Sequence, residues 1–341
     1  MKEITIYDIA KALGVSASSV SRAISNSSKV SKETRRKVLA AAEAMGYRVN
    51  NFARNLRKDN NNKLIGVIFH KLNSQFTINA LYSIEKVARD AGYDIIICHS
   101  GESYQQEIIN AENLFQRRVD GLIAGLSSDV ENNDHFNKFI DNDIPVVFFD
   151  RVKEDFFGVK VVLDNFDAAY RATTHLIEQG CKRIVHIAGK QTSSVYIDRL
   201  KGYQQALRDN NIPYRKDLVL MHGVDAAAAP LLAAAILSMS PQPDGVFAVN
   251  DLCAVLCMKI LIKAKIKIPQ DMAFVGFNND PIGTIIEPEL TTINYTGAEI
   301  GRVVAENLVE EITNKLNGKN NFTVKLKPEL IIRDSSRKTL Q

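Results

Sequence analysis

The sequence has no run of eighteen or more apolar residues, and its first residues, MKEITIYDIAKALG, contain neither an apolar signal core nor a small-residue cleavage site. A helix that crosses a bilayer needs about 20 apolar residues, so the first absence predicts that no segment spans a membrane. The second absence argues against export through a cleaved signal peptide. We therefore expect a cytoplasmic protein that makes no contact with a membrane.

Cysteine is also scarce. The 341 residues include four cysteines, and no two of them form a Cys-x-x-Cys pair. This pattern predicts reduced thiols rather than a disulfide framework. Cys253 and Cys257 lie four residues apart on one face of an expected helix, beside Val255, Leu256 and Ile260. Half a metal site is the alternative, but we interpret both as buried core thiols and expect no metal and no cofactor.

The motifs of common enzymes are missing. The segment IAGKQTSS contains Gly-Lys without the G-x-x-x-x-G-K-[ST] spacing of a phosphate loop, and neither G-x-G-x-x-G nor G-x-S-x-G nor H-E-x-x-H occurs. The six histidines are scattered, and we place His175 and His186 at the edge of the core. The sequence therefore predicts that the protein is not an enzyme.

Charge is distributed unevenly along an otherwise ordinary soluble composition. Hydrophobic residues make up 45% of the chain and charged residues 24%, as in a globular protein of two or three domains. Residues 1–60 carry a net charge of +7, whereas residues 61–341 carry −3. A small basic head on a slightly acidic body indicates that the head binds a polyanion, with a merely solvated surface as the alternative.

The head shows the pattern of two short helices and a tight turn. In TIYDIAKALGVSASSVSRAIS, the apolar residues Ile6, Ile9, Ala10 and Leu13 share one helix face. Thr5 and Ser16 are expected N-caps, and Gly14 supplies the turn between the helices. Small residues at the start of the second helix, followed by Arg22, suit entry into the major groove of DNA.

A third helix is predicted in SKETRRKVLAAAEAMGY, from a Ser31 cap to Gly46, with Val38, Ala42 and Met45 facing inward. Its basic run, Arg35 to Lys37, faces solvent. Phosphate contact and simple solubility are both open for this run.

This head, from TIYDIAKALG to AAEAMGY, resembles the DNA-binding head of the lactose-repressor (LacI/GalR) family of bacterial transcription regulators. The shared pattern is T-I-x-D-I-A-x-x-x-G-V-S-x-x-x-V-S-R, and a looser match reaches PELIIRDSS near the C-terminus. The resemblance implies a cytoplasmic, nucleoid-associated bacterial repressor. Such a protein is a homodimer that binds a pseudo-palindromic operator in double-stranded DNA, and a small effector controls its affinity.

The resemblance also implies roles for single residues of the head. The positions that read base edges are Ala17, Ser18 and Arg22, and the Arg22 guanidinium suits guanine O6 and N7. Backbone phosphates would be contacted by Thr5, Tyr7, Ser16, Ser21 and Asn26. For Tyr7, packing on the core of the head is an open alternative.

Between head and body lies NNFARNLRKDNNN, residues 50–62, in which Leu56 stands among cations. The resemblance identifies this stretch as a hinge helix that forms on DNA. Leu56 would wedge between base pairs in the minor groove, while Arg54 and Arg57 face phosphates. A flexible basic tether is the alternative.

From Lys63 onward, apolar runs alternate with amphipathic stretches, which predicts parallel sheets covered on both faces. We assign LIGVIF, YDIIICHS, DGLIAGL and IPVVFFD to one set of strands, and VKVVLD, RIVHIAG, DLVLMH, GVFAVN and MAFVGFN to a second. The chain would cross between lobes near Leu163–Asp164 and again near Leu290–Asn294.

The predicted fold is thus an all-α helix-turn-helix head plus a two-lobed α/β body with doubly wound parallel sheets, of the periplasmic-binding-protein type that the resemblance implies. The head spans residues 1–49, the hinge 50–62 and the body 63–341. The first lobe takes about 63–162 plus 294–323, and the second about 163–290 plus the C-terminal segment.

Ligands of open α/β sheets bind beyond the carboxyl ends of the strands. Polar residues follow six of these ends, at 70–71, 100, 150–151, 189–190, 250–251 and 278–280. The resemblance implies that Phe76 stacks on the effector, that Arg199 clamps it, and that Asp150, Arg151, Asn250 and Asn278 bind it. Strand-end caps or bonds between lobes are the alternative for many of these side chains.

Two departures from the family leave the effector open. SQFT replaces a common Asn-Pro-Phe-Phe, and Asn278 stands where many sugar-binding members have Asp. We expect a sugar or sugar derivative, with a nucleobase, a sugar phosphate or a role as a solute-binding protein as alternatives. The helix at Asn79–Gly92 is our candidate for the dimer contact.

Overall fold

The computed structural model describes residues 4–25, 27, 29–47, 62–189, 191–314 and 320–338. The chain divides into two compact units between Asn62 and Lys63. Each unit is described by itself below.

The first unit contains three helices, α1 (Ile6–Leu13), α2 (Ala17–Ile24) and α3 (Lys32–Ala44). Thr5 begins α1 with a capping box, in which its backbone N–H and its hydroxyl donate to the Asp8 carboxylate at 2.8 and 2.7 Å. Gly14 ends α1 in the left-handed conformation at φ 62°, where glycine has no Cβ to clash. The helices meet on a small core whose buried members are Ile9, Ala10, Val20, Ala23, Val38 and Ala42.

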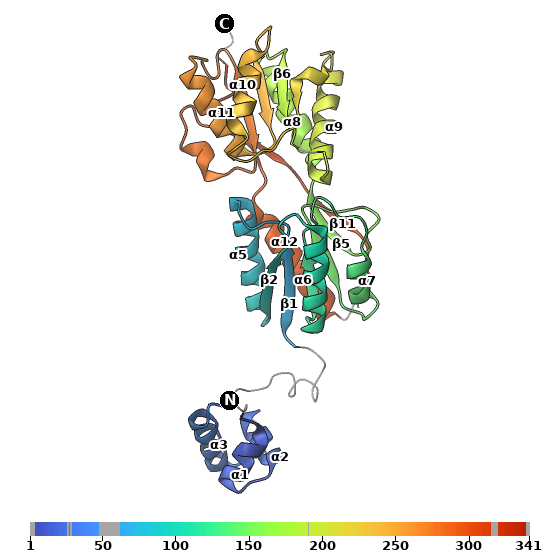
Figure 1. Cartoon of the computed structure of the whole chain (residues 1–341), viewed down its shortest axis with the longest axis vertical. Helices are drawn as coiled ribbons and strands as arrows, with labels where there is room; N and C mark the ends of the chain where they lie inside the picture. The colour runs from blue at the N-terminus through green and yellow to red at the C-terminus, as the bar shows by residue number, and fades with distance from the viewer. Residues whose placement is uncertain are drawn as a thin grey trace. The chain divides into compact units, whose positions relative to one another are not determined.

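The second unit holds two six-stranded sheets, each covered by helices on both faces (Figure 1). The first sheet has the order β11-β5-β4-β3-β1-β2, and all its strand pairs are parallel. Helices α5 and α12 cover one face, and α6 and α7 the other. The elements of this lobe are β1 (Leu64–Phe69), α5 (Gln75–Asp90), β2 (Asp94–His99), α6 (Tyr104–Gln116), β3 (Gly121–Ala124), α7 (Asp134–Ile140), β4 (Val146–Phe149), β5 (Val159–Leu163), α12 (Gly297–Thr313) and β11 (Thr323–Leu326).

The second sheet has the order β12-β10-β9-β8-β6-β7, with α8 and α9 on one face and α10 and α11 on the other. Its pairs are parallel except for β12, which runs antiparallel to β10 at the edge. The elements are α8 (Asn165–Glu178), β6 (Ile184–Ile187), α9 (Ser194–Asp209), the 3₁₀ turn η1 (Lys216–Leu218), β7 (Val219–Leu220), α10 (Ala229–Ser238), β8 (Gly245–Ala248), α11 (Asp251–Lys263), β9 (Ala273–Phe277), the 3₁₀ turn η2 (Pro281–Thr284), β10 (Thr291–Asn294) and β12 (Glu329–Ile331).

The strand pairing corrects two details of the sequence analysis. The VKVVLD segment forms β5 and pairs with β4 and β11 in the first sheet, so its assignment to the second set is wrong. The return crossing lies after Asn294 rather than within Leu290–Asn294, because β10 is still part of the second sheet. A third crossing joins β11 to β12 at residues 327–328. Apolar content alone cannot say which sheet a buried strand joins, since both interiors need the same side chains.

Helices α5 and α12 come from distant parts of the chain but lie side by side on the first sheet (Figure 1). Two glycines one helical turn apart allow this close contact. A Cβ on Gly297 would lie 1.8 Å from the Phe76 carbonyl oxygen, and a Cβ on Gly301 would lie 2.3 Å from that of Ala80. The backbone of α12 therefore rests directly on α5.

The core contains the sulfur and imidazole groups expected there. Cys253 and Cys257 are fully buried, which confirms their interpretation as core thiols. His175 Nε2 and the Ser336 hydroxyl share a hydrogen bond of 2.7 Å. The His186 ring stacks between those of Tyr203 and Phe247. Among the described residues, no helix has both the length and the apolarity to cross a membrane.

Replacing Gly301 by Ala should destabilise the body, because the new methyl group overlaps backbone that cannot move aside. We expect the free energy of unfolding in urea to fall by about 1–3 kcal/mol. Gly223→Ala is the matched control, since a Cβ there meets nothing closer than 3.7 Å. Equal unfolding midpoints for the two variants would show that the α5–α12 contact is not tight.

Candidate functional site

Helix α2 carries the three residues predicted to read base edges, Ala17, Ser18 and Arg22. Ser16 caps the helix by accepting a hydrogen bond from the Ser19 N–H at 3.1 Å, and its hydroxyl also lies 2.9 Å from that of Ser18. Ser18 and Arg22 are exposed one turn apart, so both can reach an external partner. Ala17 is partly buried and packs against the core of the head.

Some of the remaining predicted DNA contacts belong to the described residues of the head, and the others lie outside them. The Tyr7 side chain is 70% exposed, so the alternative that it packs inside the head is wrong. The Thr5 hydroxyl is exposed but bonded to Asp8, and Ser21 is partly exposed. The predicted contacts Asn26, Arg54, Leu56 and Arg57 lie outside the described residues.

In the body, Arg199 is buried at the carboxyl ends of the second sheet. Its Nε donates to Asn165 Oδ1 at 2.9 Å and its Nη1 donates to the Val249 carbonyl at 2.7 Å. The guanidinium lies 3.5 Å from the ring centroid of Phe277, the last residue of β9. Burial lowers the pKa of Arg199 to about 10, which still leaves the side chain charged at neutral pH.

Asp150 and Arg151 follow β4 at the corresponding end of the first sheet. Asp150 is buried and adopts φ 59°, a left-handed conformation that Asp tolerates better than most residues. Arg151 Nη1 donates to both Glu102 carboxylate oxygens, at 2.9 and 2.7 Å. Burial lowers the pKa of Arg151, but the charges of Asp150 and Glu102 outweigh it and shift the pKa upward.

Aromatic rings bring the two lobes together around these charges. Tyr295 directly follows β10, and its hydroxyl donates to Asp150 Oδ1 at 3.2 Å. The centroid of the Tyr295 ring lies 4.7 Å from that of the Phe76 ring. Tyr196 on α9 lies 6.0 Å from the Arg151 guanidinium and 5.8 Å from that of Arg199. Asp150, Arg151, Phe76 and Arg199, predicted from separate segments, thus belong to one cluster.

His70, at the end of β1, belongs to this cluster as a neutral group. Burial and the nearby Arg151 lower the pKa of His70 to about 4, although Asp150 and Glu102 oppose this shift. Among the described residues, four buried polar atoms at the strand ends of both lobes have no hydrogen-bond partner: His70 Nδ1, Ser100 Oγ, Arg151 Nε and Ser193 Oγ. Buried polar groups normally have partners, so these four atoms mark where a polar ligand would be bound.

The two predicted asparagines differ in their surroundings. Asn250 uses its amide as the N-cap of α11, accepting from the Cys253 N–H at 2.8 Å and donating to the Val224 carbonyl at 2.9 Å. This is the strand-end cap that the sequence left as an alternative. Asn278 is partly buried at φ 107°, and its backbone N–H donates to the Ile293 carbonyl. Lys190, named with the strand ends, lies outside the described residues.

Several members of the cluster were not singled out from the sequence. Tyr196 could have been found, because it lies three residues before Arg199 on the same helix face. Tyr295 and Glu102 carry no local signal. Tyr295 is brought in by the return crossing, and Glu102 by the turn between β2 and α6.

Comparisons with known proteins agree with this architecture. Residues 5–50 match the family model of bacterial regulatory proteins, lacI family, and residues 173–336 match a periplasmic binding protein-like domain. The chain belongs to the LacI family of transcriptional regulators. The predicted family, the helix-turn-helix head with a two-lobed body, and the interpretation as a DNA-binding transcriptional regulator rather than an enzyme are thereby confirmed.

Individual relatives extend over the whole chain. The HTH-type transcriptional repressor PurR of Vibrio parahaemolyticus serotype O3:K6 is 29% identical over 98% of this chain and 99% of its own length. The complex of the transcriptional regulator CelR with cellobiose is 25% identical and matches with a TM-score of 0.72, over 98% of this chain and all of that one. The lac repressor dimer bound to operator and the anti-inducer ONPF has the same fold, with a TM-score of 0.82 at 22% identity over 98% and 99% of the two chains.

The His70 environment predicts a pH dependence of stability. Its pKa is about 4 in the folded state and near its ordinary value of 6.5 when unfolded, so the unfolded chain binds more protons between these values and stability rises with pH from about 4 to 6.5. His70→Gln should therefore flatten the plot of unfolding free energy against pH in this window. His99→Gln is the control, because His99 is exposed. If His70→Gln and His99→Gln both keep the wild-type slope of unfolding free energy against pH, His70 is not a buried neutral imidazole.

Proposed function

We propose that this regulator is a repressor that binds a pseudo-palindromic operator as a homodimer and is controlled by a neutral, polar, sugar-like effector bound between the two lobes. The observation that carries the proposal is the cluster at the strand ends. It combines four unpartnered buried polar atoms with the rings of Phe76, Tyr196 and Tyr295. Polar groups that converge beside apolar rings form the usual environment of a bound small molecule.

The chemistry of the cluster favours a sugar. Donors such as Arg151 Nε and Arg199 suit hydroxyl oxygens, while the Asp150 carboxylate accepts from hydroxyl groups. An aromatic ring binds the apolar face of a sugar ring. The CelR relative, which was solved as a complex with cellobiose, supports a carbohydrate effector.

Charge balance argues against the sugar-phosphate alternative. Arg151 forms an ion pair with Glu102. The exposed Lys71 lies 3.7 Å from the same carboxylate. The buried Arg199 is stabilised by the negative charge of Asp150. His70 is neutral because its pKa is about 4. Since each buried cation already has a carboxylate nearby, a phosphate would bring two negative charges into a site with no unbalanced buried cation to receive them.

An exposed apolar surface on the first lobe supports the dimer. Ile78 and Tyr82 lie one turn apart on α5 and are 51% and 68% exposed, and Ile97 on the neighbouring edge strand β2 is 42% exposed. Large apolar side chains grouped in this way mark interaction surfaces. Two-fold pairing through α5 would place two heads on the two halves of a palindromic site.

The same helix gives a route from effector to dimer. Phe76 lies in the first turn of α5, inside the cluster, and α12 holds α5 through Gly297 and Gly301. An effector that binds one arrangement of the lobes more tightly shifts the population towards it. Because α5 carries both Phe76 and the exposed face, that shift would change the spacing of the two subunits and of their hinges, where we propose that Leu56 contacts the minor groove.

Operator binding should depend on Arg22. We expect Arg22→Gln to weaken binding to a selected operator by about 1–3 kcal/mol and to relax specificity, because a bidentate contact to guanine is lost. Gel shifts with operator and scrambled duplexes measure both effects. Arg208→Gln, an equal loss of charge on the exposed end of α9, is the control. Similar affinity for both duplexes in the wild-type protein would refute sequence-specific binding.

Effector binding should depend on Asp150 and Tyr196. A thermal-shift screen of neutral sugars, sugar phosphates and nucleobases should find a stabilising neutral sugar, and Asp150→Asn and Tyr196→Ala should remove most of the shift. Tyr214→Ala, which removes a tyrosine of the second lobe that lies outside the cluster, is the control. Stabilisation by a nucleobase or a sugar phosphate instead of any neutral sugar would overturn the sugar assignment while leaving operator binding intact.

A further inference from the structure

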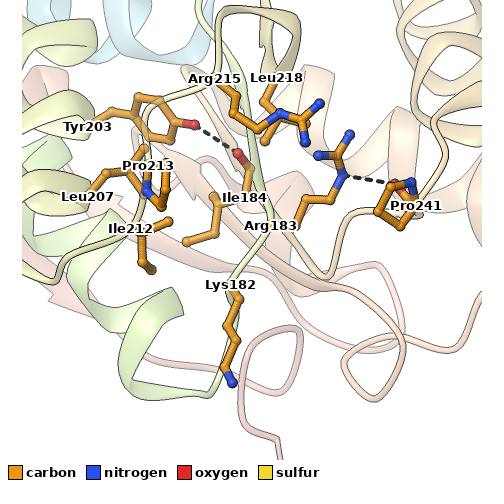
Figure 2. A pocket seen from close by; sticks show the side chains of 10 residues that line it. All are labelled: Lys182, Arg183, Ile184, Tyr203, Leu207, Ile212, Pro213, Arg215, Leu218 and Pro241. Atoms are coloured by element: carbon orange, nitrogen blue, oxygen red, sulfur yellow. Dashed lines mark hydrogen bonds between the residues drawn. The ribbon is translucent and has the colours of Figure 1, made fainter.

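A cavity of about 240 Å³ lies in the second lobe, away from the cluster described above (Figure 2). Its walls come from the amino ends of the strands: Lys182 and Arg183 precede β6, Ile184 begins it, Leu218 precedes β7, and Pro241 precedes β8. The effector cluster lies at the carboxyl ends of the same strands. The cavity is therefore a separate site that the proposed function does not use.

One wall of the cavity is apolar. Tyr203 and Leu207 from α9, together with Ile212 and Pro213 from the following loop, lie on one side of Ile184 in Figure 2. The Tyr203 hydroxyl donates to the Ile184 carbonyl at 2.8 Å, which holds the ring in place along this wall. Tyr203 and Leu207 are buried behind this wall, whereas Ile212 is partly exposed and Pro213 is exposed, so the loop supplies the surface that a small apolar body can contact.

The opposite wall is cationic. The guanidinium groups of Arg183 and Arg215 point towards each other in Figure 2, and Asp217 lies beside both, at 3.6 Å from Arg183 and 2.9 Å from Arg215. Arg183 Nε donates to the Pro241 carbonyl at 2.8 Å, which fixes its position with only 13% of the side chain exposed. These bonds use Nε and Nη2 of each arginine, so Nη1 of each is not used by them.

We propose that this cavity binds a small amphipathic anion, with its apolar body against Ile212 and Pro213 and one carboxylate or phosphate group on Arg183 and Arg215. Guanidinium groups bind such oxyanions with strong charge-assisted hydrogen bonds. Asp217 would share the two arginines with the ligand. The volume is below the ~300–1,000 Å³ of drug-sized sites, so the ligand is about the size of a single ring with a short acidic group.

The position of the cavity gives the site a physical link to the effector cluster. Helix α9 carries Tyr196 and Arg199 near its start and Tyr203 and Leu207 near its end. His186, between Tyr203 and Phe247, fills the interior of the lobe between the two ends of β6. The Ile212 N–H donates to the Leu207 carbonyl at 2.9 Å, so a ligand on Ile212 adjoins the same helix that positions the effector-binding arginine.

Benzoate is a suitable probe, because it joins one ring to one carboxylate, whereas benzyl alcohol lacks the charge and acetate lacks the ring. Saturation-transfer NMR on the full chain should detect benzoate and measure its Kd by titration. Arg215→Gln should raise that Kd by about tenfold, equivalent to about 1.4 kcal/mol, through loss of one charged partner. Ile212→Trp should abolish binding by filling the apolar side.

Lys216→Gln is the matched control, since it removes the neighbouring exposed charge without altering the lining, and it should leave the Kd unchanged. Thermal unfolding checks that each variant is folded. If Ile212→Trp fails to fold, Arg215→Gln still tests the proposal, because Arg215 lies in an exposed loop. Phenyl phosphate tests whether a phosphate replaces the carboxylate. Three results would each overturn the proposal: no benzoate signal, equal binding by Arg215→Gln and wild type, or binding of benzyl alcohol and acetate as tight as that of benzoate.

Discussion

The buried guanidinium of Arg199 holds together the carboxyl ends of the second lobe. The guanidinium contacts three segments at once: it donates hydrogen bonds to Asn165 at the start of α8 and to Val249 after β8, and it lies against the Phe277 ring at the end of β9. A buried charge is stable only where its hydrogen bonds are satisfied and an opposite charge is near, and Asp150 of the first lobe supplies that charge. The arrangement of one lobe thus depends electrostatically on the other, which is the property that an effector-controlled switch requires.

Around this cation, the structure separates rigid from adjustable parts. Within the first lobe, glycines bring α12 into backbone contact with α5, so Phe76 and the exposed residues of that helix move together. Between the lobes, the contacts include a tyrosine hydroxyl bond to Asp150, the contact of the Phe76 and Tyr295 rings, and an aromatic ring near two arginines. Such contacts are easily exchanged for contacts to a polar ligand. Backbone contact inside a lobe and side-chain contact between lobes let each lobe move as a unit, which a population shift needs.

The head and the body differ in how much of their chemistry is local. In the head, caps, turn glycine and helix faces were all predicted from neighbouring residues, and the structure places Ser18 and Arg22 on the exposed side of α2. In the body, the strands of the first set were predicted, but β5 was assigned to the wrong sheet and β10 to β12 were not identified. Short strands near a crossing carry no pattern that says which sheet they pair with, because the partner strand can lie far away in the sequence, as β11 does from β5.

The sequence by itself determined the family, the helix-turn-helix head, the alternation of strands and helices, and the polar residues at the strand ends, because each of these follows from periodicity and local chemistry. Only the tertiary structure decided that Tyr196, Tyr295 and Glu102 join Asp150 and Arg199, that Asn250 caps a helix, and that two arginines face an apolar wall at the other end of α9. The physical reason is that burial and charge pairing depend on which distant segments the crossings bring together. Neither the pKa of His70 nor the pairing of Arg151 has any counterpart in the spacing of residues along the chain.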